Sequence, residues 1–247
     1  MQQTKGQFRI IRDYKHLARE FYSGTVFVAF DTETTGLHAE SDFMLEIGAV
    51  KFSKDGIIGA PFDKIIKPPV PVPQFIEQLT GITDGMAQDG VSESSALLSF
   101  LSYLDTQNTV LIAHNAPFDL GFMHAGLERC ALGPLKNKCI DTLPLARWAY
   151  PKLVLEPQKG QYKLQSLASR FCINVMAAHR ASDDARVCME VFKRILSDTM
   201  SVQKDVQCET VREGELFKKK SRLPYTKDSP EDILQKLIKD CQKSLWP

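Results

Sequence analysis

The sequence predicts an α/β protein in which a mixed β-sheet is flanked by α-helices. Three observations predict this fold class: apolar runs of strand length, helical spacing of apolar residues elsewhere, and an order in which strands come first and then alternate with helices. With 247 residues, 43% of them hydrophobic, the chain has enough apolar material for a buried core. The formal net charge of +1 excludes polyanion binding through bulk charge, so any nucleic-acid contact needs a local patch.

The first half of the chain predicts an antiparallel meander. Residues 13–22 have helical apolar spacing, and residues 25–31 form a near-continuous apolar run, typical of a strand buried on both faces. Two further strands are expected at 43–52 and 57–68, because the links between them are short and rich in turn residues. The proline-rich segment 68–73 cannot form helix or central strand, so we expect an extended connector.

Helices and strands alternate in the second half. A helix is expected at 73–81, and another at 92–104 with Ser92 or Ser94 as its N-cap. A short buried strand is expected at 109–115. The later elements are a helix at 116–132, a short strand and helix within 136–150, a helix at 163–171 and a long amphipathic helix at 181–200.

The composition changes near Gln203, which predicts a first domain of residues 1–202 and a C-terminal appendage of residues 203–247. The appendage contains a basic cluster, residues 218–222, which suits either contact with a nucleic-acid backbone or a solvated linker. Residues 231–240 are amphipathic. They could fit the groove of a partner or pack on their own domain.

Cysteine usage and hydropathy indicate a cytoplasmic protein. Six cysteines lie far apart without a CxxC pair, which favours reduced thiols over a disulfide framework or a zinc site. The N-terminus has no apolar run of signal-peptide length, and no segment approaches about 18 consecutive apolar residues. We therefore expect a cytoplasmic location and no membrane contact.

Two carboxylates close the first predicted strand, in the stretch FVAFDTETTG. Asp31 and Glu33 are two residues apart, so a strand would point both to one face and set like charges side by side. That arrangement is costly unless a cation lies between them, and a hard divalent cation is bound through such oxygens. The alternative is that Asp31 ends the strand and that the neighbouring threonines hydrogen-bond locally.

Further acidic and imidazole side chains occur at two later junctions. Asp119 is expected in the first turn of the helix that follows His114 and Asn115, where the helix dipole favours a carboxylate. His179 precedes Asp184 by five residues across a loop-to-helix junction. Taken singly, Asp119 is explained as a helix-start residue, Asp184 as a capping residue and His179 as a loop histidine. The functional hypothesis therefore rests on their joint occurrence at the ends of successive elements.

Three segments, DTETTGL, HNAPFDLGFM and HRASDDA, resemble the three motifs of the DEDDh branch of the 3′→5′ exonucleases. Within that family the likeness is closest to the proofreading (epsilon) subunits of bacterial DNA polymerase III. LTGITDGM, DTLPLAR and YKLQSLASRF resemble its connecting segments, in the same order. The resemblance covers residues 25–196 and implies a ribonuclease H-like fold, with residues 1–202 as the exonuclease domain.

The resemblance also implies the roles of site residues. It implies that His179 is a general base, since histidine can take a proton near neutral pH. By the family's histidine-to-aspartate spacing, Asp184 rather than Asp183 is the metal ligand. The four residues implied to hold two divalent ions, Mg²⁺ or Mn²⁺, are Asp31, Glu33, Asp119 and Asp184.

Binding of the last nucleotide is implied for five residues, with Leu37 near its base: Thr34, Thr35, Leu37, Asn115 and Phe118. Three basic residues are candidates for contact with the polymer or else solvated surface charges: Arg180, which follows the proposed base His179, and Lys163 and Arg186 as possible phosphate contacts.

The activity implied is metal-dependent release of nucleoside monophosphates from the 3′ end of single-stranded or frayed DNA. The protein would act either alone or as a subunit that edits for a DNA polymerase. One alternative is trimming of RNA 3′ ends, because the same site chemistry does not inspect the sugar strongly. An alternative of another class is a non-catalytic module that binds nucleic acid or a polymerase.

Overall fold

The computed structural model describes residues 8–106, 108–157 and 159–217, with side chains described up to residue 200. The chain divides into two compact units, residues 1–202 and 203–247, and the sheet and the site lie in the first. The predicted basic cluster and the predicted amphipathic segment of the appendage lie outside the described residues. No helix in the described part of the chain is long and apolar enough to cross a membrane.

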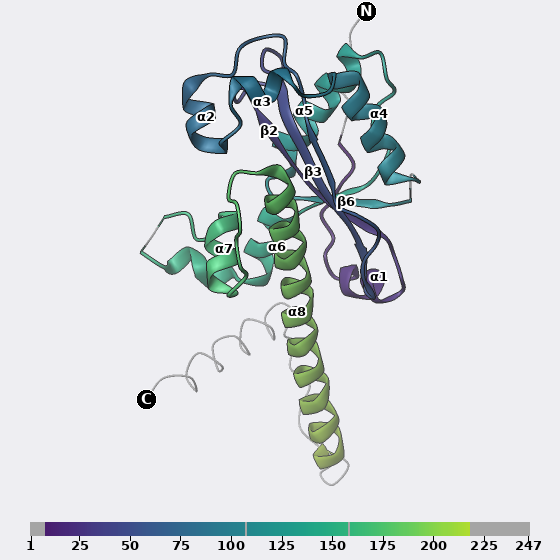
Figure 1. Cartoon of the computed structure of the whole chain (residues 1–247). Helices are drawn as coiled ribbons and strands as arrows, with labels where there is room; N and C mark the ends of the chain where they lie inside the picture. Colours follow the sequence, from purple (N-terminus) through teal and green to yellow (C-terminus); the bar gives the residue numbers. More distant parts are fainter. Residues whose placement is uncertain (1–7, 107, 158, 218–247) are drawn as a thin grey trace, which may run out of the picture. The chain divides into compact units, whose positions relative to one another are not determined.

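A mixed seven-stranded sheet forms the centre of the fold, in the order β1-β7-β6-β2-β3-β4, with β5 also paired to β3 (Figure 1). β2 is antiparallel to β3 and parallel to β6, and β6, β7 and β1 continue in parallel. The predicted meander is confirmed, but its third strand is split into β4 and β5. The strands are β1 (Ile10–Ile11), β2 (Phe27–Thr34), β3 (Met44–Ser53), β4 (Gly56–Ile57), β5 (Phe62–Ile65), β6 (Val110–Ala113) and β7 (Cys139–Asp141).

The helices follow the predicted order, and Ser92 is the N-cap of α4, accepting a hydrogen bond from the Ser95 N–H. The helices are α1 (Leu17–Tyr22), α2 (Gln74–Thr80), α3 (Asp84–Gln88), α4 (Glu93–Leu104), α5 (Ala116–Arg129), α6 (Thr142–Ala149), the 3₁₀ helix η1 (Pro151–Leu155), α7 (Leu164–Arg170) and α8 (Ala181–Phe217).

Three short elements and one helix end differ from the sequence prediction. β1, α3 and η1 were not predicted, because two to five residues are too few to show a period. The helix predicted to end at residue 200 continues to Phe217. Residues 201–217 are more polar than the earlier part of this helix, but no proline interrupts them, so the helical backbone hydrogen bonds can continue.

Helices cover the sheet on both faces, and each face has its own apolar core. α1, α6, α7 and α8 pack on the face to which Phe27 and Ala29 contribute, whereas α4 and α5 pack on the face of Val28 and Phe30. The alternation along β2 thus continues as the period of two requires. Asp31 and Glu33, further along β2, fall in register with Phe27 and Ala29 on the face that α8 covers.

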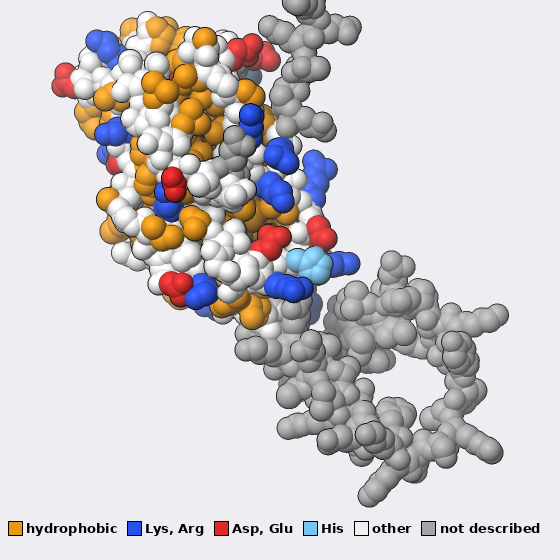
Figure 2. All heavy atoms as spheres, turned by 90° about the vertical axis from the view of Figure 1, so that its right-hand side faces the viewer, with side chains coloured by type: hydrophobic (Ala, Val, Ile, Leu, Met, Phe, Trp, Pro, Cys, Tyr) orange, Lys and Arg blue, Asp and Glu red, His pale blue; other side chains and the backbone are white. Residues whose placement is uncertain are grey.

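The described cysteines are unpaired, and the surface carries charges of both signs (Figure 2). Cys130, Cys139, Cys172 and Cys188 are free thiols, as predicted. On the face drawn in Figure 2, acidic and basic side chains both lie among apolar ones. No single sign of charge covers that face.

Candidate active site

The end of β2 extends beyond its parallel neighbour. Pairing between β2 and β6 stops at Ala29 and Ile112, so the last part of β2 is paired only with β3. Asp31 lies opposite Gly48 and Glu33 lies opposite Glu46. Both acidic side chains therefore leave the strand where β6 no longer flanks it, at the carboxyl end where sites of open sheets form.

Gly48 allows the first turn of α8 to lie directly on the sheet. A Cβ atom at Gly48 would stand 2.1 Å from the backbone carbonyl carbon of Ala181 and from the backbone nitrogen of Ser182. Only a residue without a side chain permits that approach. Because Asp31 is the register partner of Gly48, the same contact brings the start of α8 next to Asp31.

The turn between β6 and α5 positions Asp119. Asn115 has the left-handed conformation, with φ of 64°, and its N–H donates to Asp141 Oδ1 at 2.9 Å. α5 then starts at Ala116, which places Asp119 in the first turn. The Thr32 N–H and hydroxyl both donate to Asp119 Oδ1, at 3.0 and 2.9 Å, so β2 holds this buried carboxylate directly.

His179 lies in the loop between α7 and α8, which hydrogen bonds hold in place. The residue is exposed and left-handed, with φ of 62°, and its N–H donates to Asp184 Oδ2 at 3.0 Å. The other oxygen of Asp184 accepts from Gln165 Nε2 at 2.8 Å. A non-glycine residue at this φ is strained, so these contacts hold it in place.

The structure brings the sequence-predicted acids and histidine together. Ligand atoms of Glu33, His179 and Asp184 lie within 4.8 Å of one another. Asp31 and Asp119 lie close enough that the negative charge of Asp119 helps to raise the pKa of Asp31, after burial as the largest cause. We call Asp31, Glu33, Asp119 and Asp184 the carboxylate cluster.

Burial raises the pKa of every member of the carboxylate cluster. The pKa of Glu33 rises to about 8 through burial and then the charge of Asp184. Burial raises the pKa of Asp119 to about 7 despite the hydrogen bonds from Thr32, and it also raises that of Asp184. Without a cation, Glu33 and Asp119 retain protons near neutral pH, because like charges cannot all be ionised in one buried place.

The donor set fits a hard divalent cation. Carboxylate oxygens of Glu33 and Asp184 converge with the His179 imidazole, and the charges of Asp31 and Asp119 act on the same place. Carboxylate oxygens are the ligands of Mg²⁺ and Mn²⁺. Gln165 Oε1, beside Asp184, is buried with no hydrogen-bond partner among the described residues. Buried polar atoms are normally paired, so this orphan also suits a site that a bound group completes.

The sequence reasoning missed Glu46, a fifth acid beside the cluster. Its side chain is fully buried, and its oxygens accept from Arg180 Nε and Nη2, the shortest contact being 2.8 Å, and from the Ala181 N–H. A single carboxylate in the apolar run FMLEIGAVKF was the available signal. Thr32 and Gln165 were also missed as partners of cluster acids, because their contacts come from distant segments.

Internal ion pairs engage two of the three basic residues that were candidates for contact with the polymer. Arg180 binds Glu46, and Arg186 binds Asp183 at 2.7 Å and also Glu190. Asp183 further accepts from the N–H groups of Met176 and Ala177, both at 2.7 Å. Asp183 therefore ties the loop before α8, whereas Asp184 faces the cluster.

The residues predicted to bind the terminal nucleotide lie at the end of β2, in the turn after it and at the start of α5. The Thr34 hydroxyl donates to the Gly36 carbonyl, and Thr35 Oγ1 accepts from the Phe43 N–H, so both threonines shape the turn after β2. Leu37, in that turn, is 76% exposed. Phe118 is partly buried in the first turn of α5, its ring centroid 5.0 Å from that of Phe122.

Comparison with known proteins identifies the family. Residues 28–192 match the family model RNase_T, described as "Exonuclease". DNA polymerase III subunit epsilon of Treponema pallidum is 44% identical over 171 residues, which cover 69% of this chain and 76% of that protein. DNA polymerase III PolC-type of Latilactobacillus sakei is 42% identical over 159 residues, but the chain spans only 10% of that protein.

Solved structures show the same fold at low sequence identity. E. coli exonuclease I in complex with a dT13 oligonucleotide superposes with a TM-score of 0.63 at 21% identity, over 73% of this chain and 43% of that one. The predicted mixed α/β fold is thus confirmed. The family match spans the segments that hold all three sequence motifs, and the chain belongs to the exonuclease family, as a 3′→5′ exonuclease domain.

Proposed function

We propose that this chain releases nucleoside 5′-monophosphates, one at a time, from the 3′ end of single-stranded or frayed DNA. The observation that carries the proposal is the convergence of the carboxylate cluster and His179 at the carboxyl end of β2. Relatives named as DNA polymerase III proteins, and a neighbour solved with a DNA oligonucleotide, support DNA as the substrate.

Divalent cations are the proposed cofactors, two ions of Mg²⁺ or Mn²⁺. Asp31, Glu33, Asp119 and Asp184 would hold them, since none of these acids has an arginine within 4.0 Å in the described part of the chain, unlike Glu46 and Asp183. When bound, such ions stabilise the charge that develops on a phosphodiester during hydrolysis and lower the pKa of water.

His179 is the proposed general base. Its ring lies within 4.8 Å of Glu33 and Asp184 and is exposed, so it can reach a water molecule beside the scissile phosphate. Its backbone N–H, bound to Asp184, keeps the residue beside the cluster. The imidazole would take the proton of the attacking water and release it to solvent.

The terminal nucleotide would be gripped from two sides. Leu37 offers an exposed apolar side chain to the base from the turn after β2, and Thr34 and Thr35 fix that turn. Asn115 and Phe118 would form the other side, from the start of α5. Grip on the last base would favour unpaired 3′ ends, whose bases are free to enter.

A time course with 5′-labelled single-stranded DNA and matched RNA tests the proposal. Wild-type protein in Mg²⁺ or Mn²⁺ should produce a ladder that shortens from the 3′ end, faster on DNA. Asp31→Ala, His179→Ala and EDTA should each suppress the ladder, because each removes a part of the catalytic centre. Equal ladders from wild type and both variants would reject the assigned residues, and faster shortening of RNA would favour the trimming alternative.

A DNA polymerase is the proposed partner, and a cytoplasmic location follows from that role. The support is the 44% identity to a protein named as a polymerase III subunit. Co-purification of a polymerase with the tagged full-length chain from its own cells, retained by wild type and by His179→Ala alike, is expected. An exonuclease that elutes alone under those conditions would favour independent action.

A further inference from the structure

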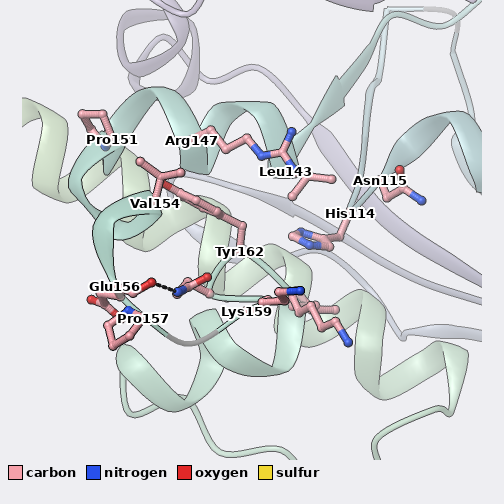
Figure 3. Close-up of a pocket in the computed structure, with 14 residues that line it drawn as sticks. His114, Asn115, Leu143, Arg147, Pro151, Val154, Glu156, Pro157, Lys159 and Tyr162 are labelled. Atoms are coloured by element: carbon pink, nitrogen blue, oxygen red, sulfur yellow. Dashed lines mark hydrogen bonds between the residues drawn. The ribbon is translucent and has the colours of Figure 1, made fainter.

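A cavity of about 900 Å³ lies between α6, η1 and the loop that leads to α7. Asn115 lines it from the junction before α5, and Lys163 and Leu164 line it from the start of α7 (Figure 3). The same two elements reach the cluster, because α5 carries Asp119 and Gln165 of α7 donates to Asp184. The cavity and the cluster therefore share the junction before α5 and the start of α7, although no acid of the cluster is among the described lining residues.

Three cations line this cavity: Arg147, Lys159 and Lys163. None of them has a carboxylate within 4.0 Å among the residues that the structure describes. The acidic residue of the described wall, Glu156, is paired with Arg170 at 2.6 Å. The cavity is therefore a local positive patch on a chain of formal net charge +1.

Unlike these three cations, the two arginines near the carboxylate cluster are already in ion pairs. Arg180 and Arg186 are held by Glu46 and by Asp183, so their charges are already balanced. A phosphate chain that approaches the carboxylate cluster needs positive charge that nothing internal neutralises. In the described part of the chain, the cavity beside Asn115 offers that charge on three side chains.

The remaining wall suits sugars and bases. Tyr162 stands in the cavity with the Arg147 guanidinium 5.8 Å from its ring centroid, and Leu143 and the largely exposed Val154 add apolar surface. In Figure 3, Arg147 and Lys159 approach from opposite sides, with Tyr162 between them. Proteins that bind single strands combine a cationic groove with aromatic stacking faces in this way.

We infer that this cavity holds the nucleotides immediately 5′ of the terminal nucleotide, with their phosphates facing Arg147, Lys159 and Lys163. The inference rests on the proposed function, because it assigns a path to the strand whose 3′ end that function hydrolyses. The volume is near the upper limit for sites that hold small molecules, about 300–1,000 Å³. A strand seated there anchors the substrate without contact to the reacting phosphate.

The test compares the triple variant Arg147→Gln/Lys159→Gln/Lys163→Gln with Lys136→Gln. Lys136 is a lysine in the loop before β7, at the opposite end of the parallel strands, and also lacks a carboxylate partner among the described residues. Fluorescence anisotropy of a labelled oligothymidylate in Ca²⁺, at several salt concentrations, measures binding. Hydrolysis is measured on the same oligonucleotide and on the p-nitrophenyl ester of thymidine 5′-monophosphate, which has no upstream nucleotide.

The triple variant should raise Kd for the oligonucleotide about tenfold or more. It should also reduce the salt dependence of log Kd by about 0.7 for each phosphate that the protein no longer neutralises. Its kcat/KM should fall about tenfold more for the oligonucleotide than for the ester. Lys136→Gln should match wild type in all three readouts. If a thermal melt shows that the triple variant is unfolded, Lys159→Gln alone, in a loop, should give a smaller change in the same direction.

A folded triple variant with wild-type Kd and salt slope overturns the inference, as does an equal loss of kcat/KM on both substrates. The proposed function fails separately, when wild type hydrolyses neither substrate in Mg²⁺ or Mn²⁺. The binding measurement still decides the role of the cavity in that case, because it does not depend on hydrolysis.

Discussion

Two sets of carboxylates lie near the carboxyl end of β2, and they differ in whether they are paired with arginine. Glu46 and Asp183 are each paired with an arginine and with backbone N–H groups. The carboxylate cluster has no arginine or lysine within 4.0 Å among the described residues. Paired acids hold the loop and α8 in place, and the unpaired ones leave charge for a cation to neutralise.

The pKa values of adjacent residues on α8 show the same difference. Burial raises the pKa of Asp183, but the hydrogen bonds from Ala177 and Arg186 outweigh it and lower that pKa overall. The pKa of Asp184 is raised, because burial outweighs its bonds from Gln165 and His179. One position along a helix thus separates an anchor of the loop from a candidate metal ligand.

The largest expected effect is on kcat, when Asp184 or its neighbour Asp183 is replaced by asparagine. Asp184→Asn keeps the side-chain shape but removes a ligand charge, so kcat should fall by about 10²–10³-fold or more, comparable to loss of one preorganised electrostatic group. Asp183→Asn should lower kcat far less and instead reduce Tm, since Arg186 and the N–H groups of the loop before α8 lose one charged acceptor. Steady-state hydrolysis of an oligonucleotide and thermal melts measure both effects. A greater loss of kcat in Asp183→Asn would reverse the ligand assignment.

Removing the arginine of the buried pair should produce the largest loss of stability. Arg180→Met leaves the fully buried Glu46 without its cation, beside Glu33, and should cost about 3–5 kcal/mol. Chemical denaturation monitored by circular dichroism measures the free energy of unfolding. The double variant Arg180→Met/Glu46→Gln should recover part of the loss, because it removes the stranded charge. A single variant as stable as wild type would show that the pair is dispensable.

The contact between α8 and the sheet can be tested at Gly48. Gly48→Ala would place a Cβ against the backbone of Ala181 and Ser182, so the first turn of α8 must shift. Overpacking of this kind costs about 1–3 kcal/mol, and here it also moves Asp184 away from Asp31. Gly133→Ala is the matched control, because its Cβ would meet nothing within 4 Å. Equal Tm and activity in both variants would mean that the site does not depend on this approach.

The sequence predicted the elements of the site better than their contacts. The apolar run before Asp31 and the three motifs predicted β2, the α5 start and the α8 start, because local patterns suffice for those. Glu46 could not be assigned, since its position opposite Glu33 is a register between strands. Arg180 was a candidate for contact with the polymer, because the sequence does not show that Arg180 forms an ion pair with Glu46. The short elements β1, α3 and η1 depend on tertiary packing more than on local propensity.

The smallest expected effect is a pH dependence of stability that a divalent cation removes. In the metal-free protein, the pKa of Glu33 is raised from 4.5 to about 8 and that of Asp119 from 3.8 to about 7. The folded state therefore keeps protons that the unfolded chain releases, and stability falls as pH rises from about 4 to about 8. The pKa of Asp183 is lowered instead, so its contribution to stability is lost only when the pH falls below that of the window given above.

Thermal melts in EDTA should thus show a lower Tm at about pH 8 than at about pH 5. Even one unit of the shift in pKa corresponds to about 1.4 kcal/mol, which is roughly 3–6 °C in Tm for a chain of this size. Saturating Mg²⁺ or Mn²⁺ should raise Tm most at the higher pH, because the cation replaces the protons. Glu33→Gln should flatten the EDTA curve, whereas Asp183→Asn should keep its slope over this range. If Tm in EDTA instead rises with pH, the acids of the carboxylate cluster do not retain protons in the folded state, and the prediction is wrong.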